Sequence, residues 1–379
     1  KNFIQINNGN SFQSFCLKKI KSIFKIIKSK KISKDFWRMK ISEFNLADKF
    51  WKDYLKKEYI LEIIKIKKIK KIKVFLNSED YMFNKLIEKL NSAQIYKDNK
   101  NYLSKNYIFY KFYFFGIYLI KIINLIRELK NIKLLKKERK INLDRYKNIF
   151  FANYPDHFNK KFEINYSKND NSFFYYVSLI RNNSNFLNQP SKKKYLDLIK
   201  KRNFEFIEKD ISYLETIRNY FFNSKIIKKK ITYNLNLLGI KNYHEKFINF
   251  YHRHVELPKL INYETGIKKT LSKINNSKSV HYGYFEFIEG RIISKNLHGN
   301  FKNFIGYQHA FMGFFQKIRC LEVLNFIDKD QLPRKISFFQ QNLPKNLSLK
   351  FKKIKLVFKK RIYKKKKFFK YNKKINILV

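Results

Sequence analysis

Apolar and polar residues follow three different patterns in the first ninety residues of this 379-residue chain. Through Leu17–Ile32, Ile and Phe alternate irregularly with Lys, which predicts a basic arm. The segment Leu46–Leu55 predicts a short helix, and Asn84–Leu90 predicts a second one. Between them, Ile60–Leu76 alternates Ile with Lys, so we predict one strand or paired strands there.

The most apolar stretch of the chain is Tyr107–Ile126. Its longest uninterrupted apolar run, Phe112–Ile120, is nine residues, about half of what a bilayer requires. Lys111 and Lys121 would each cost a few kcal/mol inside a membrane. We therefore predict a buried helix and no membrane span. The alternative is a helix that anchors an organelle-encoded subunit of a membrane complex.

Apolar periodicity is weaker from residue 150 to 260 and returns near Leu257. Clusters of Asn, Ser and Lys at 167–172 and 181–185 predict loops. Beyond them, the pattern predicts a helix at Thr265–Ile274 and a strand at Gly283–Ile288. Further strands are predicted near 336–339 and within 347–358.

These segments together predict an α+β fold. It would comprise a degenerate KH-like N-terminal domain, a helical insertion, and a small α+β C-terminal domain with an extended basic tail. The predicted boundaries are 1–45 for the basic arm, 46–130 for the KH-like domain, 131–260 for the mostly helical insertion, 261–360 for the C-terminal domain and 361–379 for the tail.

The charge of the chain is strongly unbalanced, with 84 Lys and Arg against 29 Asp and Glu, a net +55. Such a charge opposes the compact state unless a polyanion neutralises it, and nucleic acid is the usual polyanion. Abundant Lys, Asn, Phe and Tyr indicate a very A/T-rich genome, organellar genomes above all. Cys16 and Cys320 form no CxxC, which favours a reducing compartment. The opening Lys1-Asn2-Phe3 lacks the pattern of a signal peptide or an import presequence, which fits synthesis inside an organelle.

Motifs of catalysis are missing from the sequence: it contains no GxxxxGK[ST], GxGxxG, GxSxG or HExxH. The densest polar group is His244, Glu245, His252, His254 and Glu256, which could hold zinc but is far more typical of a basic helix. Asp328 and Asp330 could form a two-metal pair, and a turn is the stronger interpretation. We predict no enzyme activity, no metal and no cofactor.

Basic runs that alternate with apolar or aromatic residues are the best candidates for an RNA interface. The Lys65–Lys73 run would present one row of ammonium groups to a phosphate backbone, and the acid-free tail adds stacking groups such as Phe368. The predicted RNA-binding residues are Lys65, Lys67, Lys68, Lys70, Lys71, Arg291, Lys295, Lys352, Lys353, Lys360, Arg361, Lys364, Lys365, Lys366 and Lys367.

Two stretches resemble the small-subunit ribosomal proteins of the S-three family, in their divergent mitochondrially encoded form. The first is the basic run Gly266–Lys273, followed by Tyr284–Ile288, Glu289-Gly290-Arg291-Ile292 and Gly306. It is similar to the family's basic helix and to the strand that ends in a Gly-Arg-aliphatic turn. The second is Leu46–Leu90, which resembles the order of the KH-type domain. Asn77-Ser78-Glu79-Asp80 stands where the family has GxxG.

The resemblance implies a place in the head of the small ribosomal subunit, against ribosomal RNA and beside the channel through which mRNA enters. By resemblance, Lys268, Lys269 and Lys273 would face mRNA, and Ser272 replaces a basic residue of the family there. The expected function is therefore that of a non-catalytic structural component of the mitochondrial ribosome. Its partners would be ribosomal RNA, mRNA and neighbouring small-subunit proteins in the mitochondrial matrix. A ribosomal protein of another position is an alternative.

Overall fold

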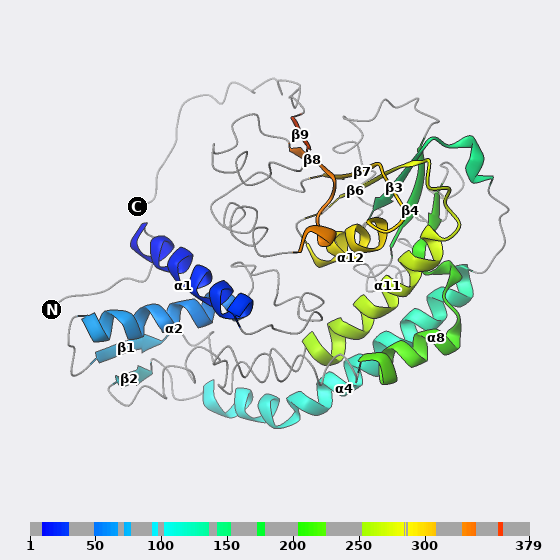
Figure 1. Cartoon of the computed structure of the whole chain (residues 1–379). Coiled ribbons are helices and arrows are strands. Elements are labelled where there is room, and N and C mark those ends of the chain that lie inside the picture. Colours follow the sequence, from blue (N-terminus) through cyan, green and yellow to red (C-terminus); the bar gives the residue numbers. More distant parts are fainter. Residues whose placement is uncertain are drawn as a thin grey trace, which may run out of the picture.

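Helices and a large parallel sheet make up the chain in a computed structural model (Figure 1). The structure describes residues 10–29, 49–66, 72–76, 93–97, 102–135, 142–152, 173–178, 204–224, 252–283, 285, 287–307, 328–338 and 355–358.

The N-terminal elements are two helices and two short parallel strands. They are α1 (Asn10–Ser29), α2 (Lys49–Ile66), β1 (Ile72–Leu76) and β2 (Ala93–Lys97). Aromatic rings join the helices, because Phe12 and Phe15 lie 5.3 and 5.1 Å from the ring of Tyr59. An ion pair of 2.6 Å between Lys19 and Glu58 lies beside these rings. Apolar contact and one charge pair therefore hold α1 against α2.

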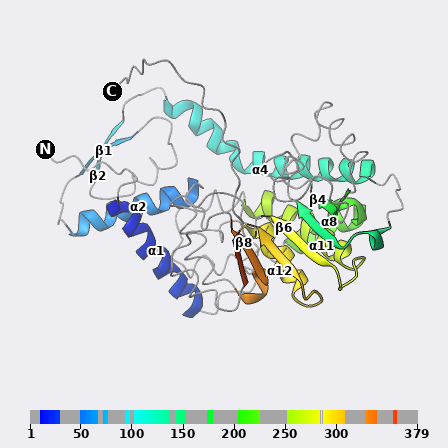
Figure 2. The same ribbon diagram turned by 90° about the horizontal axis from the view of Figure 1, so that it is seen from above.

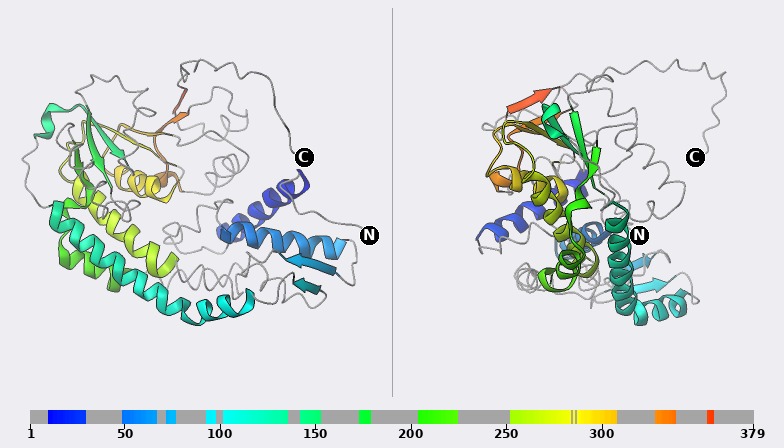
Figure 3. Two further views of the ribbon diagram at one scale, coloured as in Figure 1. Left: turned by 180° about the vertical axis from the view of Figure 1, so that it is seen from behind. Right: turned by 90° about the vertical axis from the view of Figure 1, so that its right-hand side faces the viewer.

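A seven-stranded sheet is formed by strands between residues 148 and 358, and all of its strand pairs are parallel. In chain order its strands are β3 (Asn148–Ala152), β4 (Phe173–Val177), β5 (Phe204–Phe206), β6 (Ser279–Gly283), β7 (Phe304–Tyr307), β8 (Lys335–Phe338) and β9 (Lys355–Phe358). Their order across the sheet is β5-β4-β3-β6-β7-β8-β9. The chain thus builds the sheet outward from β3 on one side, then returns to β3 and builds outward on the other side (Figure 3).

Both faces of the strands are buried, as is usual for parallel sheets. In β3, Ile149 and Phe151 belong to the hydrophobic core that the helices cover, and Phe150 between them is buried on the opposite face. β4 repeats the pattern with Phe174 and Tyr176 in that core. Runs such as Asn148–Ala152 and Phe173–Val177 are therefore apolar on both faces, which obscures the period of two.

Helices α11 (Leu257–Leu271) and α12 (Ile288–Leu297) contribute to the core of the sheet, through Ile267 and Ile292 among others. Helices α4 (Tyr102–Leu135) and α8 (Tyr213–Arg218) contact one another and lie beyond α11 (Figures 1 and 2). The connections also contain the short helical segments η3 (Leu143–Arg145), η5 (Ile207–Asp210), η6 (Asn219–Asn223), η7 (His252–Glu256) and η9 (Lys329–Gln331).

The prediction of helices together with a sheet is confirmed at that level, and the domain division differs from the structure. Residues 131–260 were predicted as a mostly helical insertion, yet they supply β3, β4 and β5. These strands pair with β6–β9 of the predicted C-terminal domain, so the boundary at 260/261 falls within one structural unit, inside α11. Parallel pairing joins strands that are distant in sequence, and local periodicity does not record this.

Three local predictions differ from the structure. The Ile/Lys alternation of Ile60–Leu76 predicted one strand or paired strands; its end is confirmed as β1, but the part up to Ile66 belongs to α2. The strand predicted at Gly283–Ile288 lies earlier, because β6 ends at Gly283. The Gly290-Arg291 turn expected from the resemblance is instead part of α12. The helix at Thr265–Ile274 is confirmed as the C-terminal part of α11, and the strand near 336–339 is confirmed as β8.

The helix predicted at Tyr107–Ile126 exists as part of α4, but its predicted burial was wrong. Phe112 is 60% exposed and Phe115 is 69% exposed, and several aliphatic side chains that follow are exposed as well. In the part of the chain that the structure describes, no helix is long and apolar enough to cross a membrane.

Candidate ligand-binding edge of the sheet

The reversal of strand order at β3 creates a defined position in the sheet. β3 pairs with β4 on one side and with β6 on the other, and the chain leaves these two strands in opposite directions. Because all the strands are parallel, their carboxyl ends meet at one edge. In open α/β sheets, ligands bind outside the carboxyl ends at this switch point. The carboxyl ends of β3 and β6 are therefore the candidate site.

Small residues occupy both of these ends, Ala152 on β3 and Gly283 on β6. A Cβ atom added to Gly283 would meet no described atom within 4 Å. Gly283 is nevertheless a buried residue. Neither close packing against described atoms nor a left-handed backbone explains a glycine here. Gly283 therefore leaves room beside the switch point.

Gly306 on β7 has the opposite environment. A Cβ atom there would lie 2.7 Å from the Cβ of Phe285 and 2.7 Å from the Cγ of Pro333. Only glycine allows Phe285, which is fully buried, to pack this closely on β7. This contact holds Phe285, which lies between β6 and α12 in the sequence, close against β7.

Helix α12 starts directly after this connection, with Phe287 as its N-cap residue. The first helical hydrogen bond runs from the Arg291 amide to the Phe287 carbonyl over 3.0 Å. The amides that precede it belong to the first turn, whose N–H groups carry partial positive charge. Glu289 is a buried acid in the same turn. Both hydrogen-bond donors and a carboxylate thus follow the end of β6.

Hydrogen bonds hold α12 against the sheet. The hydroxyl groups of Tyr282 and Ser294 lie 2.5 Å apart, and the Ser294 Oγ donates to the Gly290 carbonyl over 2.9 Å. At the other end, His298 Nε2 donates to the Leu332 carbonyl over 2.7 Å. Because Tyr282 is fully buried, the pKa of its hydroxyl is raised far above the ordinary value. This pair is therefore neutral and positions the helix.

The face of the sheet opposite α11 and α12 carries an aromatic cluster around His281. Its Nδ1 lies 2.9 Å from the hydroxyl of Tyr307, the last residue of β7, and its Nε2 lies 3.1 Å from the Ser279 hydroxyl. The ring of Phe173 meets the imidazole edge-on at 5.2 Å. Both ring nitrogens of His281 are thus engaged, and Tyr307 is held at the carboxyl edge.

A second polar pair lies where β4 and β5 end. The hydroxyl of Ser178, directly after β4, donates to Glu208 in η5 over 2.6 Å. Both residues are buried. Lys209 pairs with Glu205 over 2.6 Å beside them. This corner is built from intramolecular contacts and keeps β4 and β5 in register.

The three lysines expected to face mRNA are all involved in ion pairs within the protein. Lys268 lies 3.2 Å from Glu264, Lys269 lies 2.6 Å from Glu215, and Lys273 lies 2.5 Å from Asp210. Partial burial alone would raise the pKa of Glu215, but the hydrogen bonds from Lys269 and Ser212 lower it below the ordinary value. The pair of Lys268 lies within α11, whereas those of Lys269 and Lys273 tie the C-terminal end of this helix to α8 and η5.

The other predicted RNA-binding residues fall into three groups. Arg291 is 1% exposed, so its guanidinium lies inside the protein. Lys295 lies 3.8 Å from Asp330, and Lys65 is exposed near the end of α2. The remaining ones lie outside the described residues: Lys67, Lys68, Lys70, Lys71, Lys352, Lys353, Lys360, Arg361, Lys364, Lys365, Lys366 and Lys367.

The acidic and histidine candidates from the sequence have local roles. His254 in η7 meets the ring of Tyr118 at 4.9 Å. Asp328 accepts a hydrogen bond from the Gln331 amide over 2.9 Å through its carbonyl, which confirms a turn at this position. Among the residues that the structure describes, no three His, Cys, Asp or Glu side chains are grouped so that they could hold a metal ion.

A buried acid, Glu128, lies where α4, η6 and α11 meet. Its carboxylate accepts hydrogen bonds from the Tyr220 hydroxyl over 2.7 Å and from the Asn262 amide over 2.8 Å. Burial raises the pKa of Glu128 to about 7, although both hydrogen bonds and the positive charge of Lys259 act in the other direction. In the sequence, Glu128 lies 92 positions from Tyr220 and 134 positions from Asn262. No local pattern therefore indicates that these residues meet.

Comparison with protein-family models, with curated proteins and with solved structures returned no match for this chain. The site is therefore defined by strand order and local geometry. Sequence reasoning missed it, although the apolar runs at 148–152 and 173–177 were a usable signal of buried parallel strands.

Proposed function

We propose that residues 148–358 form an α/β domain that binds a phosphate-bearing nucleotide at the carboxyl ends of β3 and β6. The observation that carries this proposal is the strand order with its reversal at β3. Nucleotides bind at such switch points on doubly wound sheets, with phosphate groups near the first turn of a helix. The analogy between folds and the local geometry together support this site.

Three features suit such a ligand, two of them at that edge. Gly283 leaves room for a group to approach the backbone. The first turn of α12 contains the amide of Gly290, and the partial positive charge at a helix N-terminus favours phosphate oxygens. The net charge of +55 attracts anions over long distances. Phosphate would lie by the α12 first turn, and Glu289 in that turn would accept a hydrogen bond from a sugar hydroxyl.

Filling the space at Gly283 tests this proposal. Gly283→Val places a β-branched side chain, which suits a strand, into open space. Gly299→Val is the matched control, because Gly299 follows the other end of α12 and a Cβ there also meets no described atom within 4 Å. Binding of nucleoside diphosphates and nucleotide sugars is measured by calorimetry on the full chain, at about 0.15 M salt to reduce non-specific attraction.

The expected result is saturable binding of one nucleotide per chain, at least tenfold weaker in Gly283→Val and unchanged in Gly299→Val. Inorganic phosphate serves as the probe of charge alone. The proposal fails if no nucleotide binds, or if both variants bind as the wild type does.

A second candidate function is the one implied by the resemblance: a component of the mitochondrial small ribosomal subunit that includes a KH-like N-terminal domain. The net charge favours it, because nucleic acid is the usual partner of so basic a chain. The pairing of Lys268, Lys269 and Lys273 with acids of this chain weighs against their predicted contact with mRNA.

Co-sedimentation with ribosomal subunits tests this second candidate. If the chain binds ribosomal RNA, the logarithm of the affinity should fall with the logarithm of salt concentration by roughly 0.7 to 0.9 per neutralised phosphate. A flat dependence, or absence from both subunits, would exclude it.

A further inference from the structure

Helix α4 carries two apolar stripes on opposite sides. The inner stripe packs on the protein and includes Ile117, Leu125 and Ile132, all buried. The outer stripe repeats every three or four residues and is exposed. Its members are Phe112, Phe115, Leu119, Ile122 and Ile126. A surface helix normally shows polar residues on its outer face, so this outer stripe requires a partner.

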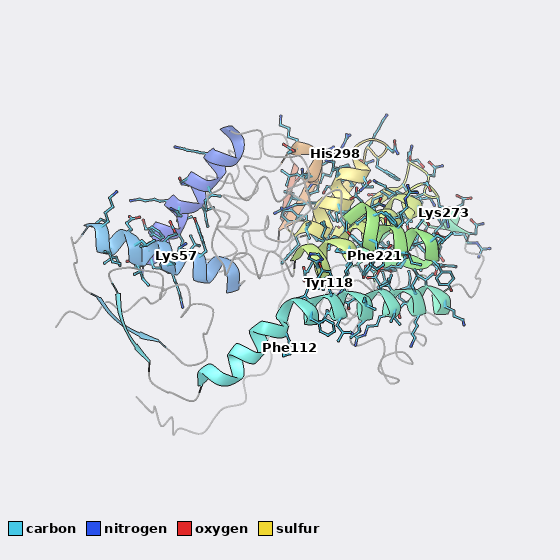
Figure 4. All side chains as sticks on the ribbon, turned by 90° about the horizontal axis from the view of Figure 1, so that it is seen from below. Lys57, Phe112, Tyr118, Phe221, Lys273 and His298 are labelled. Atoms are coloured by element: carbon cyan, nitrogen blue, oxygen red, sulfur yellow. The ribbon has the colours of Figure 1, made fainter. Side chains whose placement is uncertain are left out.

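Further exposed apolar side chains lie on α8 and η6, which pack beside α4. Lys121 of α4 places its Nζ 4.5 Å from the ring centre of Phe221 in η6, and α4 contacts α8 (Figure 4). Leu214 of α8 is 79% exposed and Phe222 of η6 is 66% exposed. Among the large apolar side chains that the structure describes as exposed, all but Leu61 and Ile66 belong to α4, α8 and η6.

The size of this surface exceeds what a monomer usually exposes. Eight large apolar side chains of α4 and five of α8 and η6 are exposed, by 36–79% each. At about half of the roughly 150–250 Å² of an aromatic side chain each, they present on the order of 1,000 Å². The largest apolar patch of a typical soluble monomer is roughly 300–600 Å². An exposed patch of this size marks an interaction surface.

The unpaired charges around the patch are basic, since the acid of α8, Glu215, forms an ion pair with Lys269. Lys130 and Lys133 continue the outer stripe of α4, four and then three residues further along the helix, and both are exposed. Arg218 is exposed on α8. The acid of α4, Glu128, is buried against Tyr220 and Asn262 on the inner side. Apolar side chains bordered by cations match an anionic membrane surface, with the apolar groups among the acyl chains and the cations at the headgroups.

We propose that α4, α8 and η6 form a surface that lies in the plane of an anionic lipid bilayer without crossing it. A second copy of the chain is a poorer occupant, because two molecules with a net charge of +55 repel one another. A span is incompatible with the inner stripe, where Asn124, Glu128 and Asn131 are buried against the protein. With 34 residues, α4 provides about 51 Å of helix to lie along the surface.

Tryptophan reporters on the full chain test the proposal. Leu119→Trp places the reporter in the centre of the outer stripe. Ile66→Trp is the matched control, because Ile66 is 70% exposed on α2. Each variant adds one tryptophan to the same two native ones. The vesicles are phosphatidylcholine alone, or phosphatidylcholine with phosphatidylglycerol at a ratio of about 7:3.

With the anionic vesicles, emission of the Leu119→Trp variant should shift to shorter wavelength and be quenched by lipids brominated in the acyl chains. Both effects should persist at about 0.5 M salt, where attraction between exposed charges is screened. The Ile66→Trp variant should show neither effect. Combining Phe115→Asp, Leu119→Asp and Ile126→Asp, all exposed positions, should reduce vesicle co-sedimentation by roughly tenfold or more.

Three outcomes would overturn the proposal. The first is unchanged emission of the Leu119→Trp variant on vesicles. The second is binding that disappears at high salt without a spectral shift, which would indicate adsorption through the basic residues alone. The third is a shift that depends on protein concentration in the absence of lipid, which would assign the surface to a second copy of the chain. None of these outcomes depends on nucleotide binding.

Discussion

Replacing Glu128 by Gln should remove a pH dependence from the stability of the protein. Burial raises the pKa of Glu128 to about 7, from an ordinary value of 4.5. The folded protein therefore binds this proton more tightly than the unfolded chain does. Between pH 4.5 and pH 7 the unfolded chain releases this proton while the folded protein still holds it. The free energy of unfolding must therefore fall as the pH rises through this range.

The magnitude follows from the size of the shift. One pKa unit corresponds to about 1.4 kcal/mol, so the contribution of Glu128 amounts to about 3 kcal/mol between pH 4.5 and pH 8. Glutamine resembles the protonated acid, since its amide can donate to the Tyr220 hydroxyl while its carbonyl accepts from the Asn262 amide. The stability of Glu128→Gln relative to wild type should thus increase by about 3 kcal/mol across this range.

Urea denaturation at constant salt, followed by circular dichroism at several pH values, measures this difference. Glu215→Gln is a control of opposite sign, because the pKa of Glu215 is lowered by its hydrogen bonds from Lys269 and Ser212. Its contribution to stability is lost as the pH falls, whereas that of Glu128 is lost as the pH rises. A difference between Glu128→Gln and wild type that stays constant with pH, or that reverses, would refute the reasoning.

Two further predictions concern packing. Gly306→Ala should destabilise the protein by about 1–3 kcal/mol, because its Cβ would lie 2.7 Å from atoms of Phe285 and Pro333; thermal denaturation measures this, and an effect no larger than that of Gly299→Ala would contradict it. In a Cys320→Ser background, Cys16 should resist an aromatic disulfide reagent at pH 8 and react only in urea, since burial raises the pKa of its thiol to about 12. Rapid labelling of the folded protein would contradict the burial of Cys16.

Local structure could be predicted where one face of an element differs from the other. The C-terminal part of α11 was found in this way, because Ile267 and Leu271 are buried while Lys268 and Ser272 are exposed. The same reasoning failed from Ile60 to Ile66, where alternating Ile and Lys suggested a strand and α2 continues. A short alternating run is compatible with the period of a strand and with that of a helix. Packing against α1 favours the helix here.

The candidate site could not be predicted, because it depends on which strands are neighbours. Ala152 and Gly283 are 131 positions apart in the sequence and end two adjacent strands. Nothing in either segment by itself indicates the other. The ion pairs of Lys269 and Lys273 were not predicted for the same reason, since their partners Glu215 and Asp210 lie more than fifty positions away.

The sequence by itself determined the excess of positive charge, the exclusion of several common catalytic motifs and the apolar character of Tyr107–Ile126. Composition and unbroken runs are properties of the chain in any conformation. The tertiary structure decided the parallel order of the strands, the burial of Arg291 and Glu128, and the exposure of the outer stripe of α4. These features depend on which distant segments pack together and bury one another's apolar surface. The pattern of residues within one segment does not show which other segment it will pack against.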